Sequence, residues 1–292
     1  MDHINQFERA SVRGADTFSM NDSTSNHVAP RSVQRVRHVL KLRRVSVRAV
    51  RRLSPHVASI TFASDELRDF VSASFDDHVK LMLPPGPGQE LVLPVLQADG
   101  SRAAPPAGSV PPVMRDYTPR RIDHAAGELD IEFALHGDGP AARWAAQAAP
   151  GQQVGIGGPR GSFVVPLDVE WHLLIGDTSA LPAIARRLEE LPATTRAIVL
   201  VQADDAADQR TLSSRAKVEV TWLGGGEDAL LRATRALTLP LGEGYAWAAG
   251  EARATAAVRR VLVDELGVDR HYIRAAAYWK HGAVAHHENI DA

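Results

Sequence analysis

Residues 171–191, WHLLIGDTSALPAIARRLEEL, contain an apolar run, a short polar turn and an amphipathic segment in succession. The apolar run predicts a buried strand, and the spacing of the apolar residues after the turn predicts a helix. A strand followed directly by a helix is the repeating unit of a parallel α/β sheet. This stretch therefore predicts that the second half of the chain is an α/β domain.

The same unit recurs towards the C-terminus. Buried strands are predicted in residues 195–205, 217–226, 244–251 and 272–280, and helices in residues 227–237 and 252–267. The helix at 252–267 ends in a glycine, as helix C-termini prefer. The alternation predicts a parallel sheet wrapped by helices. In such sheets ligands bind beyond the carboxyl ends of the strands, which are here GDTSA, QADD, LGGG and AGE.

The chain before this region has a different pattern. RRVSVRAVRRLS (43–54) alternates apolar and basic residues with a period of two, which is typical of a half-buried antiparallel strand. VASITFAS (57–64), HVKLML (78–83), VMRDYTPRRID (113–123) and GELDIEFALH (127–136) predict further strands between turns. Short strands in close succession predict an antiparallel β-barrel. We therefore expect two domains, a β-barrel in residues 37–165 and an α/β domain with a parallel sheet in residues 166–292.

Residues 1–36 are polar, with Asn, Ser, Asp and Thr gathered at 21–26, and we expect a disordered or loosely attached extension. The segment has no apolar core, so it is not a secretory signal. No apolar run in the chain approaches the ~20 residues that span a bilayer. The expectation is a cytoplasmic protein without membrane insertion.

Composition excludes several classes of chemistry. The 33 basic and 35 acidic residues of the 292-residue chain give a net charge of -2, which offers no general attraction to nucleic acid. The chain has no cysteine, which excludes disulfides, thiolate catalysis, cysteine-ligated zinc and protein-bound iron–sulfur clusters. His281, His286 and His287 lack a carboxylate or cysteine frame, and a mobile tail explains them better than a metal site.

The hexapeptide RDYTPR (115–120) combines a cation, a phenol and a hydroxyl in an extended segment. Arg115 could contact a phosphate, and Tyr117 could pack flat against a ring system. The hydroxyl of Thr118 could bond to a ring nitrogen or carbonyl. The pattern favours a flat, anionic, aromatic cofactor.

Two further stretches could contact phosphates. HGDGPAARWAAQAAPGQQVGIGGPRGSF (136–163) brackets a short helix with glycine clusters, and the helix start could face a diphosphate. The alternative is a barrel with a helical lid and a flexible loop. The turn at 177–180 could bind an anion at the following helix start, although the G-x-G-x-x-G fingerprint is absent. Its alternative is an ordinary turn in which Thr178 or Ser179 is the N-cap.

These motifs occur together and in a defined order over about residues 40–285. The matching stretches are DDHVKLMLP (76–84), RDYTPRRID (115–123), HGDGPAARWA (136–145), GGPRGSF (157–163), GDTSALPAIARRLE (176–189), WAAGEA (247–252) and YWKHG (278–282). The chain resembles the siderophore-interacting proteins, which are flavin-dependent ferric-siderophore reductases of the ferredoxin–NADP reductase superfamily.

The resemblance implies FAD in the barrel and NADH or NADPH in the second domain. The residues implied for FAD are Arg115, Tyr117, Thr118, His136, Gly137, Gly139, Pro140, Ala141, Ala142 and Trp144. The family often has a serine where this chain has Ala142, so one hydroxyl contact is missing while backbone donors remain. The residues implied for the nicotinamide nucleotide are Asp177, Thr178, Ser179, Ala180, Gly250 and Glu251.

The implied reaction moves electrons from NAD(P)H through FAD to a ferric siderophore. Because the cofactors carry this chemistry, no catalytic side chain and no protein metal site are required. An anionic chelate needs a cationic mouth, for which Lys280 is the first candidate, followed by Arg160 and Lys80; each could instead be an ordinary solvated charge. Trp279 could shield the flavin face, but a place in the core is the favoured interpretation.

The sequence leaves two questions open. Asp204 and Asp205 favour a free ribose hydroxyl and NADH, whereas Arg210 and Arg215 could accept the 2′-phosphate of NADPH. The function itself has two alternatives. One is a flavin reductase that delivers electrons to a ferredoxin-like protein carrier, and the other is a siderophore-binding module that has lost its flavin.

Overall fold

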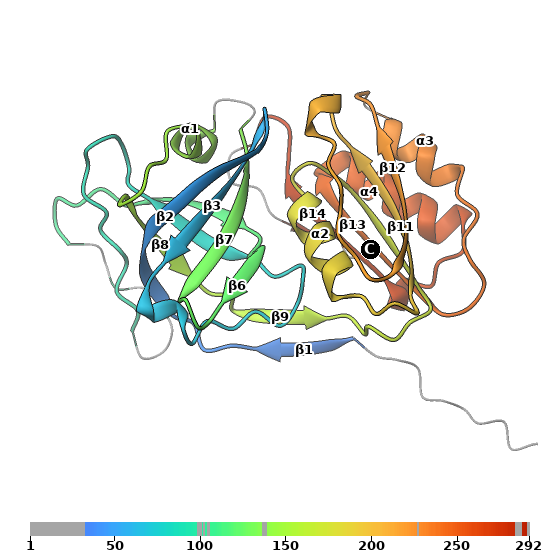
Figure 1. Cartoon of the computed structure of the whole chain (residues 1–292), viewed down its shortest axis with the longest axis horizontal. Coiled ribbons are helices and arrows are strands. Elements are labelled where there is room, and N and C mark those ends of the chain that lie inside the picture. The colour runs from blue at the N-terminus through green and yellow to red at the C-terminus, as the bar shows by residue number, and fades with distance from the viewer. Residues whose placement is uncertain are drawn as a thin grey trace, which may run out of the picture. The chain divides into compact units, whose positions relative to one another are not determined.

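The structure is a computed structural model, and it describes residues 33–97, 101, 103, 106–135, 139–226, 228–283 and 288–290. The described residues within the range 32–292 form one compact unit. Two large sheets make up this unit, and their topologies follow the change in pattern that the sequence shows at about residue 166 (Figure 1).

The first sheet is antiparallel and curls into a half-barrel (Figure 1). Its seven strands have the order β5-β4-β8-β2-β3-β7-β6. The strands are β2 (Leu42–Ser54), β3 (Val57–Ala63), β4 (Val79–Leu83), β5 (Val113–Tyr117), β6 (Arg121–Asp123), β7 (Glu128–Ala134) and β8 (Gln153–Gly157). The prediction of an antiparallel barrel-type domain is confirmed.

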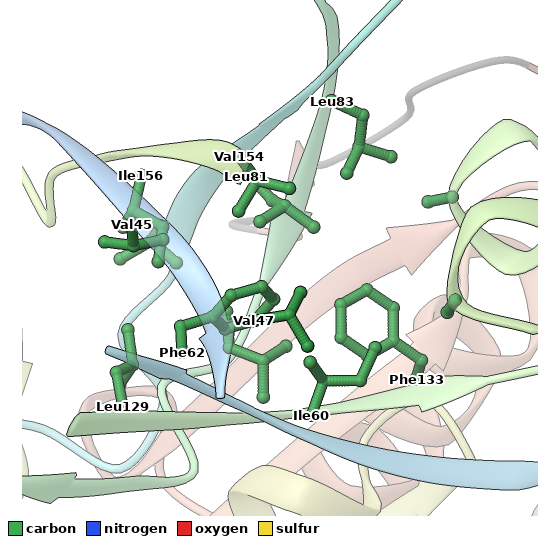
Figure 2. Packing of buried hydrophobic residues seen from close by; sticks show 14 of the residues in the cluster. Val45, Val47, Ile60, Phe62, Leu81, Leu83, Leu129, Phe133, Val154 and Ile156 are labelled. Carbon is green, nitrogen blue, oxygen red and sulfur yellow. The ribbon is translucent and has the colours of Figure 1, made fainter. Parts of the chain in front are cut away.

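The concave side of this sheet holds an apolar core. In β2 the side chains of Val45 and Val47 are buried, while Arg44 and Arg48, which flank them, are exposed, as the period of two predicts. Figure 2 shows Val45 and Val47 among the buried side chains of neighbouring strands, including Phe62, with which they form one cluster. The helix α1 (Pro140–Ala146) contributes alanines to the same cluster.

A short two-stranded sheet follows the barrel. Strand β1 (Gln34–Arg37) pairs antiparallel with β9 (Gly161–Val164). Gly161 is required there, because a Cβ at this position would lie 2.6 Å from the carbonyl oxygen of Val36. The predicted N-terminal extension, residues 1–36, therefore overlaps strand β1 at residues 34–36, where backbone pairing orders the chain. Residues 1–32 lie outside the described residues.

The second sheet has the order β12-β11-β10-β13-β14-β15. Strands β10 (Trp171–Asp177), β11 (Arg196–Gln202), β12 (Lys217–Leu223), β13 (Gly244–Glu251) and β14 (Ile273–Trp279) are parallel, and β15 (Glu288–Asn289) is an antiparallel edge. The predicted parallel sheet is confirmed, whereas β15 was not predicted because it is only two residues long.

Helices cover both faces of this sheet. Helix α2 (Leu181–Glu190) packs on one face, while α3 (Ala229–Arg235) and α4 (Ala252–Arg260) pack on the other. The chain leaves β10 towards α2 and leaves β13 towards α4, so the connections diverge between these neighbouring strands. A crevice at this switch point is where ligands bind in open α/β sheets. The remaining short helical segments are η1 (Asp65–Leu67), η2 (Ala206–Asp208), η3 (Val261–Glu265) and η4 (Arg270–Tyr272).

Polar contacts join the two sheets. The indole Nε1 of Trp247 donates to Asp76 Oδ2 at 3.1 Å, and Arg274 forms an ion pair with the same carboxylate. Arg186 of α2 donates to Ser72 Oγ at 2.8 Å. These contacts fasten β13, β14 and α2 to the segment of the first domain between η1 and β4. The proposed domain boundary, at residues 165 and 166, lies in the connection between β9 and β10 and remains a proposal.

No helix within the described residues is long and apolar enough to cross a membrane.

Candidate functional site

A cavity of about 350 Å³ lies between β5, α1 and the carboxyl end of the parallel sheet. We call it the barrel cavity. It brings together eight of the residues that the resemblance implied for the two cofactors, from both halves of the chain. They are Arg115, Tyr117, Thr118, Gly139, Ala141, Ala142, Thr178 and Ser179.

Tyr117 forms an aromatic wall of the barrel cavity. Its ring lies 4.4 Å from that of Phe133, centroid to centroid, and packs against the barrel core. Burial raises the pKa of the Tyr117 phenol above its usual value, so the ring stays neutral at physiological pH. Arg115, two positions earlier, lines the same cavity and donates from Nη1 to its neighbour's carbonyl, Met114 O, at 2.7 Å.

Thr118 is buried and its hydroxyl is hydrogen-bonded to Tyr278. Burial raises the pKa of Tyr278, which also lines the barrel cavity. The Thr118 hydroxyl therefore fastens β14 to the end of β5. The sequence did not assign a role to Tyr278, although it belongs to the motif YWKHG.

Asp116 is a cavity residue that the sequence analysis missed. Its Oδ2 accepts a hydrogen bond from Lys80 Nζ at 2.6 Å. Its Oδ1 is buried and has no hydrogen-bond partner within the described part of the chain. A buried acceptor without a donor is costly, and a ligand with an N–H or O–H group would satisfy it. Together with the Tyr117 wall, this acceptor fits a planar ring system such as flavin.

Glu132 of β7 is another unpredicted residue of the barrel cavity. Its buried carboxylate forms ion pairs with Arg210 and, at 3.3 Å, with Arg120. Arg210 is thereby turned towards the barrel. Local sequence patterns do not predict this cluster, because Arg210 lies 78 residues from Glu132 along the chain.

The predicted segment around α1 divides between two hollows. Gly139, Ala141 and Ala142 line the barrel cavity, whereas Pro140 and Trp144 line a separate hollow of about 510 Å³. The Trp144 ring stacks on Phe62 of the barrel core, with centroids 6.2 Å apart and planes at 14°. His136 and Gly137 lie outside the described residues.

A second cavity of about 620 Å³ lies at the carboxyl edge of the parallel sheet, and we call it the sheet-edge cavity. Thr178 and Trp279 line both this cavity and the barrel cavity, so the two meet there. Trp279 is 38% exposed, so the favoured interpretation of a place in the core is wrong. The full lining comprises Asp177, Thr178, Gln202, Asp204, Asp228, Leu230, Leu231, Glu251, Arg253, Ala254, Ala257, Trp279 and His281.

Asp177 joins three strand ends at the switch point. Its carboxylate accepts hydrogen bonds from Ser179 N at 2.8 Å, Glu251 N at 3.0 Å and the indole Nε1 of Trp279 at 2.8 Å. Gly250 has a φ of +147°, and a Cβ there would lie 2.5 Å from Asp177 Oδ2, so this approach requires glycine. Asp177 therefore orients Trp279 between the two cavities.

The start of α2 differs from the alternative interpretation that the sequence left open. Ala180, not Thr178 or Ser179, is the N-cap of α2, and it is fully buried. The reason is that the Ser179 hydroxyl bonds to Asp177 instead of to the helix. In α4 the carboxylate of Glu251 accepts hydrogen bonds from Arg253 N at 2.6 Å and Ala254 N at 3.0 Å, so Glu251 caps that helix.

The predicted cationic residues occupy different surroundings. Lys80 and Arg160 line a small pocket of about 60 Å³, together with His78, which also lines the barrel cavity. Lys80 is paired with Asp116, which offsets its charge. Lys280 is exposed and directly follows Trp279.

Comparison with known protein families matches both halves of the chain. A family described as "Siderophore-interacting FAD-binding domain" matches residues 46–163, and one described as "Siderophore-interacting protein" matches residues 169–282. The chain is 36% identical over 253 residues to the NADPH-dependent ferric-chelate reductase of Escherichia coli, covering 86% of this chain and 97% of that protein. It is 32% identical over 245 residues to the ferric vibriobactin reductase ViuB of Vibrio cholerae, covering 81% and 89%.

Solved structures agree with this assignment. A siderophore utilization protein from T. fusca matches with a TM-score of 0.79 and 36% identity, over 87% of this chain and 98% of that chain. The siderophore-interacting protein SipS from Aeromonas hydrophila matches with a TM-score of 0.69 and 33% identity, over 85% and 94%. The ferredoxin reductase in carbazole 1,9a-dioxygenase, at 20% identity and a TM-score of 0.59 over 80% of this chain and 68% of that one, shares the fold alone. An antiparallel FAD-binding half-barrel, a mostly parallel α/β sheet and these relatives show that the chain belongs to the siderophore-interacting protein family.

Proposed function

We propose that this protein is an FAD-dependent ferric-siderophore reductase that takes electrons from NADH or NADPH. The meeting of the two cavities at Thr178 and Trp279 is the observation that carries the proposal. One cavity lies against the FAD-binding half-barrel, and the other lies at the sheet edge where α/β domains bind nucleotides. Two ligands held there would have their reactive ends in contact.

The chain positions the cofactors and does not supply the reacting atoms. Bound FAD would supply the redox chemistry, which is to take a hydride from NAD(P)H and pass single electrons to chelated Fe(III); oxygen-rich chelators release the iron more readily once it is Fe(II). Tyr117 supplies the ring wall, Arg115 a cation, and Asp116 Oδ1 an acceptor for a ring or ribityl donor. Asp177 fixes the Trp279 indole at the junction, where the indole would border a nicotinamide ring.

The remaining predicted contacts belong to the same proposal. The backbone around Gly139 and Ala142 would border FAD, while Thr178 to Ala180 and the 250–251 pair would border the nucleotide. The FAD contacts predicted for His136 and Gly137 fall outside the described residues. Lys280, Arg160 and Lys80 form the cationic mouth for an anionic chelate, with Lys80 contributing least because Asp116 offsets its charge.

Two other predictions stay predictions. The cytoplasmic location rests on the sequence alone. Electron delivery to a ferredoxin-like carrier has no observation in its favour, because the likeness to a ferredoxin reductase is one of fold.

The visible spectrum of the purified protein tests the proposal. We expect a yellow protein that bleaches when NADH or NADPH is added without oxygen, and that regains its colour when a ferric siderophore follows. A colourless protein that FAD does not reconstitute would contradict the reductase and leave the siderophore-binding module. A bleached protein that a ferredoxin-like carrier reoxidises, but a ferric siderophore does not, would favour the carrier reductase.

A further inference from the structure

We infer that this chain binds NADH in preference to NADPH and that Asp204 determines the preference. The inference rests on the proposed function, because it concerns the nucleotide that occupies the sheet-edge cavity. It also sets this chain apart from its E. coli relative, whose name states NADPH dependence.

The geometry of the sheet-edge cavity orients the nucleotide. Its one end, at Thr178 and Trp279, is shared with the barrel cavity, so the nicotinamide ring must lie there to reach the flavin. The other end lies past β11, where Gln202 and Asp204 line the wall. Strand β11 is adjacent to β10 on the side away from β13. The adenosine ribose of a dinucleotide that spans the cavity therefore lies beside the end of β11.

The groups at that end suit a free ribose diol. Asp204 is the second residue after β11 and is packed against the loop that follows β12, because a Cβ at Gly225 would lie 3.2 Å from Asp204 Oδ1. Asp228, at the start of α3, lines the same end and makes no side-chain cap bond to its helix. A carboxylate after the second strand accepts hydrogen bonds from ribose hydroxyls, whereas it repels a 2′-phosphate that carries about two negative charges.

The arginines that could have accepted a 2′-phosphate are placed elsewhere. Arg210 forms its ion pair with Glu132 of the half-barrel. Arg215 is exposed and, within the described part of the chain, is not among the residues that line the sheet-edge cavity. Arg253 does line the cavity, but it stands at the first turn of α4, after β13, on the opposite side of β10 from Asp204. Its position suits the diphosphate that both nucleotides share.

Asp205 provides a matched control. It neighbours Asp204 in sequence, yet its carboxylate accepts a hydrogen bond from Ala207 N at 2.8 Å and lies 3.8 Å from the His56 ring of the half-barrel. The carboxylate of Asp205 thus caps η2 and contacts the half-barrel, and it does not face the nucleotide site. Asp205→Asn keeps the cap acceptor and removes the same charge as Asp204→Asn, at a position outside the cavity lining.

Calorimetric titration of the flavin-loaded protein with NAD⁺ and with NADP⁺ measures the preference without turnover. We expect the wild-type chain to bind NAD⁺ at least about tenfold more tightly than NADP⁺. Asp204→Asn should reduce that ratio, and Asp204→Arg should bring it to one or invert it. Asp205→Asn should leave the ratio as in the wild type.

The outcomes separate the inference from the proposed function. Tighter binding of NADP⁺ by the wild-type chain, or an unchanged ratio in both Asp204 variants, would overturn the inference while the reductase stands. Binding of neither nucleotide to a yellow, folded protein would overturn the inference together with the nucleotide-dependent function. The ratio of kcat/KM for NADH to kcat/KM for NADPH, measured by bleaching of the flavin, should change across the variants in the same direction as the binding ratio.

Discussion

The barrel cavity and the sheet-edge cavity are built on different principles. In the barrel cavity most polar side chains are already paired within the protein, as Thr118 is with Tyr278 and Glu132 is with Arg120. At the sheet edge the carboxylates of Asp177 and Glu251 accept hydrogen bonds from backbone N–H groups at strand and helix ends. We expect the first site to select its ligand by shape and an aromatic wall, and the second to select by charges at the ends of strands. Substitutions should therefore affect cofactor retention at one site and nucleotide reaction at the other.

The largest effect is expected from Tyr117→Ala. The change removes the wall that packs on Phe133, so we expect FAD to bind at least about 100-fold more weakly, a loss of about 3 kcal/mol. The flavin that remains after gel filtration, with titration of FAD by fluorescence, measures it. Tyr117→Phe keeps the ring and should retain FAD. If Tyr117→Ala holds FAD as tightly as the wild type, the aromatic wall does not select the ligand.

A smaller effect is expected from Asp177→Ala, and it should appear only on the nucleotide side. The variant releases Trp279 and the N–H of Glu251, so flavin bleaching by NADH should slow by about 10- to 100-fold while FAD content is unchanged. Stopped-flow absorbance measures the rate. Asp177→Asn keeps one acceptor oxygen and should lose less. If Asp177→Ala lost FAD to the same degree as it lost bleaching rate, the two sites would not be separable.

His172 allows a test at the interior of β10, away from both cavities. Burial, with a contribution from the Arg187 charge, lowers the pKa of His172 to about 3, whereas an unfolded histidine titrates near about 6.5. Between these values the unfolded chain binds a proton that the folded chain does not. The free energy of unfolding should therefore fall as pH falls from about 6.5 towards 3, by at most about 1.4 kcal/mol per pH unit from this residue.

The variant His172→Leu should flatten this slope, as measured by urea unfolding at several pH values between about 7 and 5. His124→Asn changes an exposed histidine of the half-barrel and should leave the slope as in the wild-type chain. A slope that stays the same in His172→Leu would mean that other groups control acid stability.

The smallest effects are expected at the cationic mouth. Lys280→Ala and Arg160→Ala should raise KM for an anionic ferric siderophore by about three- to tenfold, with less effect at high salt. Lys80→Ala should do less, because Asp116 already offsets the Lys80 charge. Steady-state reduction of one chelate at two salt concentrations measures this. An effect of Lys80→Ala larger than that of Lys280→Ala would contradict this ranking.

Local pattern was sufficient for most of the fold and for part of the site. The period-two run of β2 and the strand–turn–helix at 171–191 each depend on neighbours in the sequence, and both appear in the structure as expected. The residues of RDYTPR that were singled out line one cavity with Gly139 and Thr178. Asp116, Glu132 and Tyr278 were missed as cavity residues, because their partners lie far away along the chain.

The sequence by itself determined the two sheet types, their order and the resemblance to a family, since hydrophobic periodicity and contiguous motifs are local properties. Only the tertiary structure decided what each charge does. Arg210 and Asp204 lie six positions apart in one loop, yet one turns to Glu132 and the other to the sheet-edge cavity. It also decided that Trp279 stands between two cavities, because the Asp177 carboxylate at the end of another strand holds its indole. Such roles depend on which distant segments the fold brings within a few ångströms, and no local pattern encodes them.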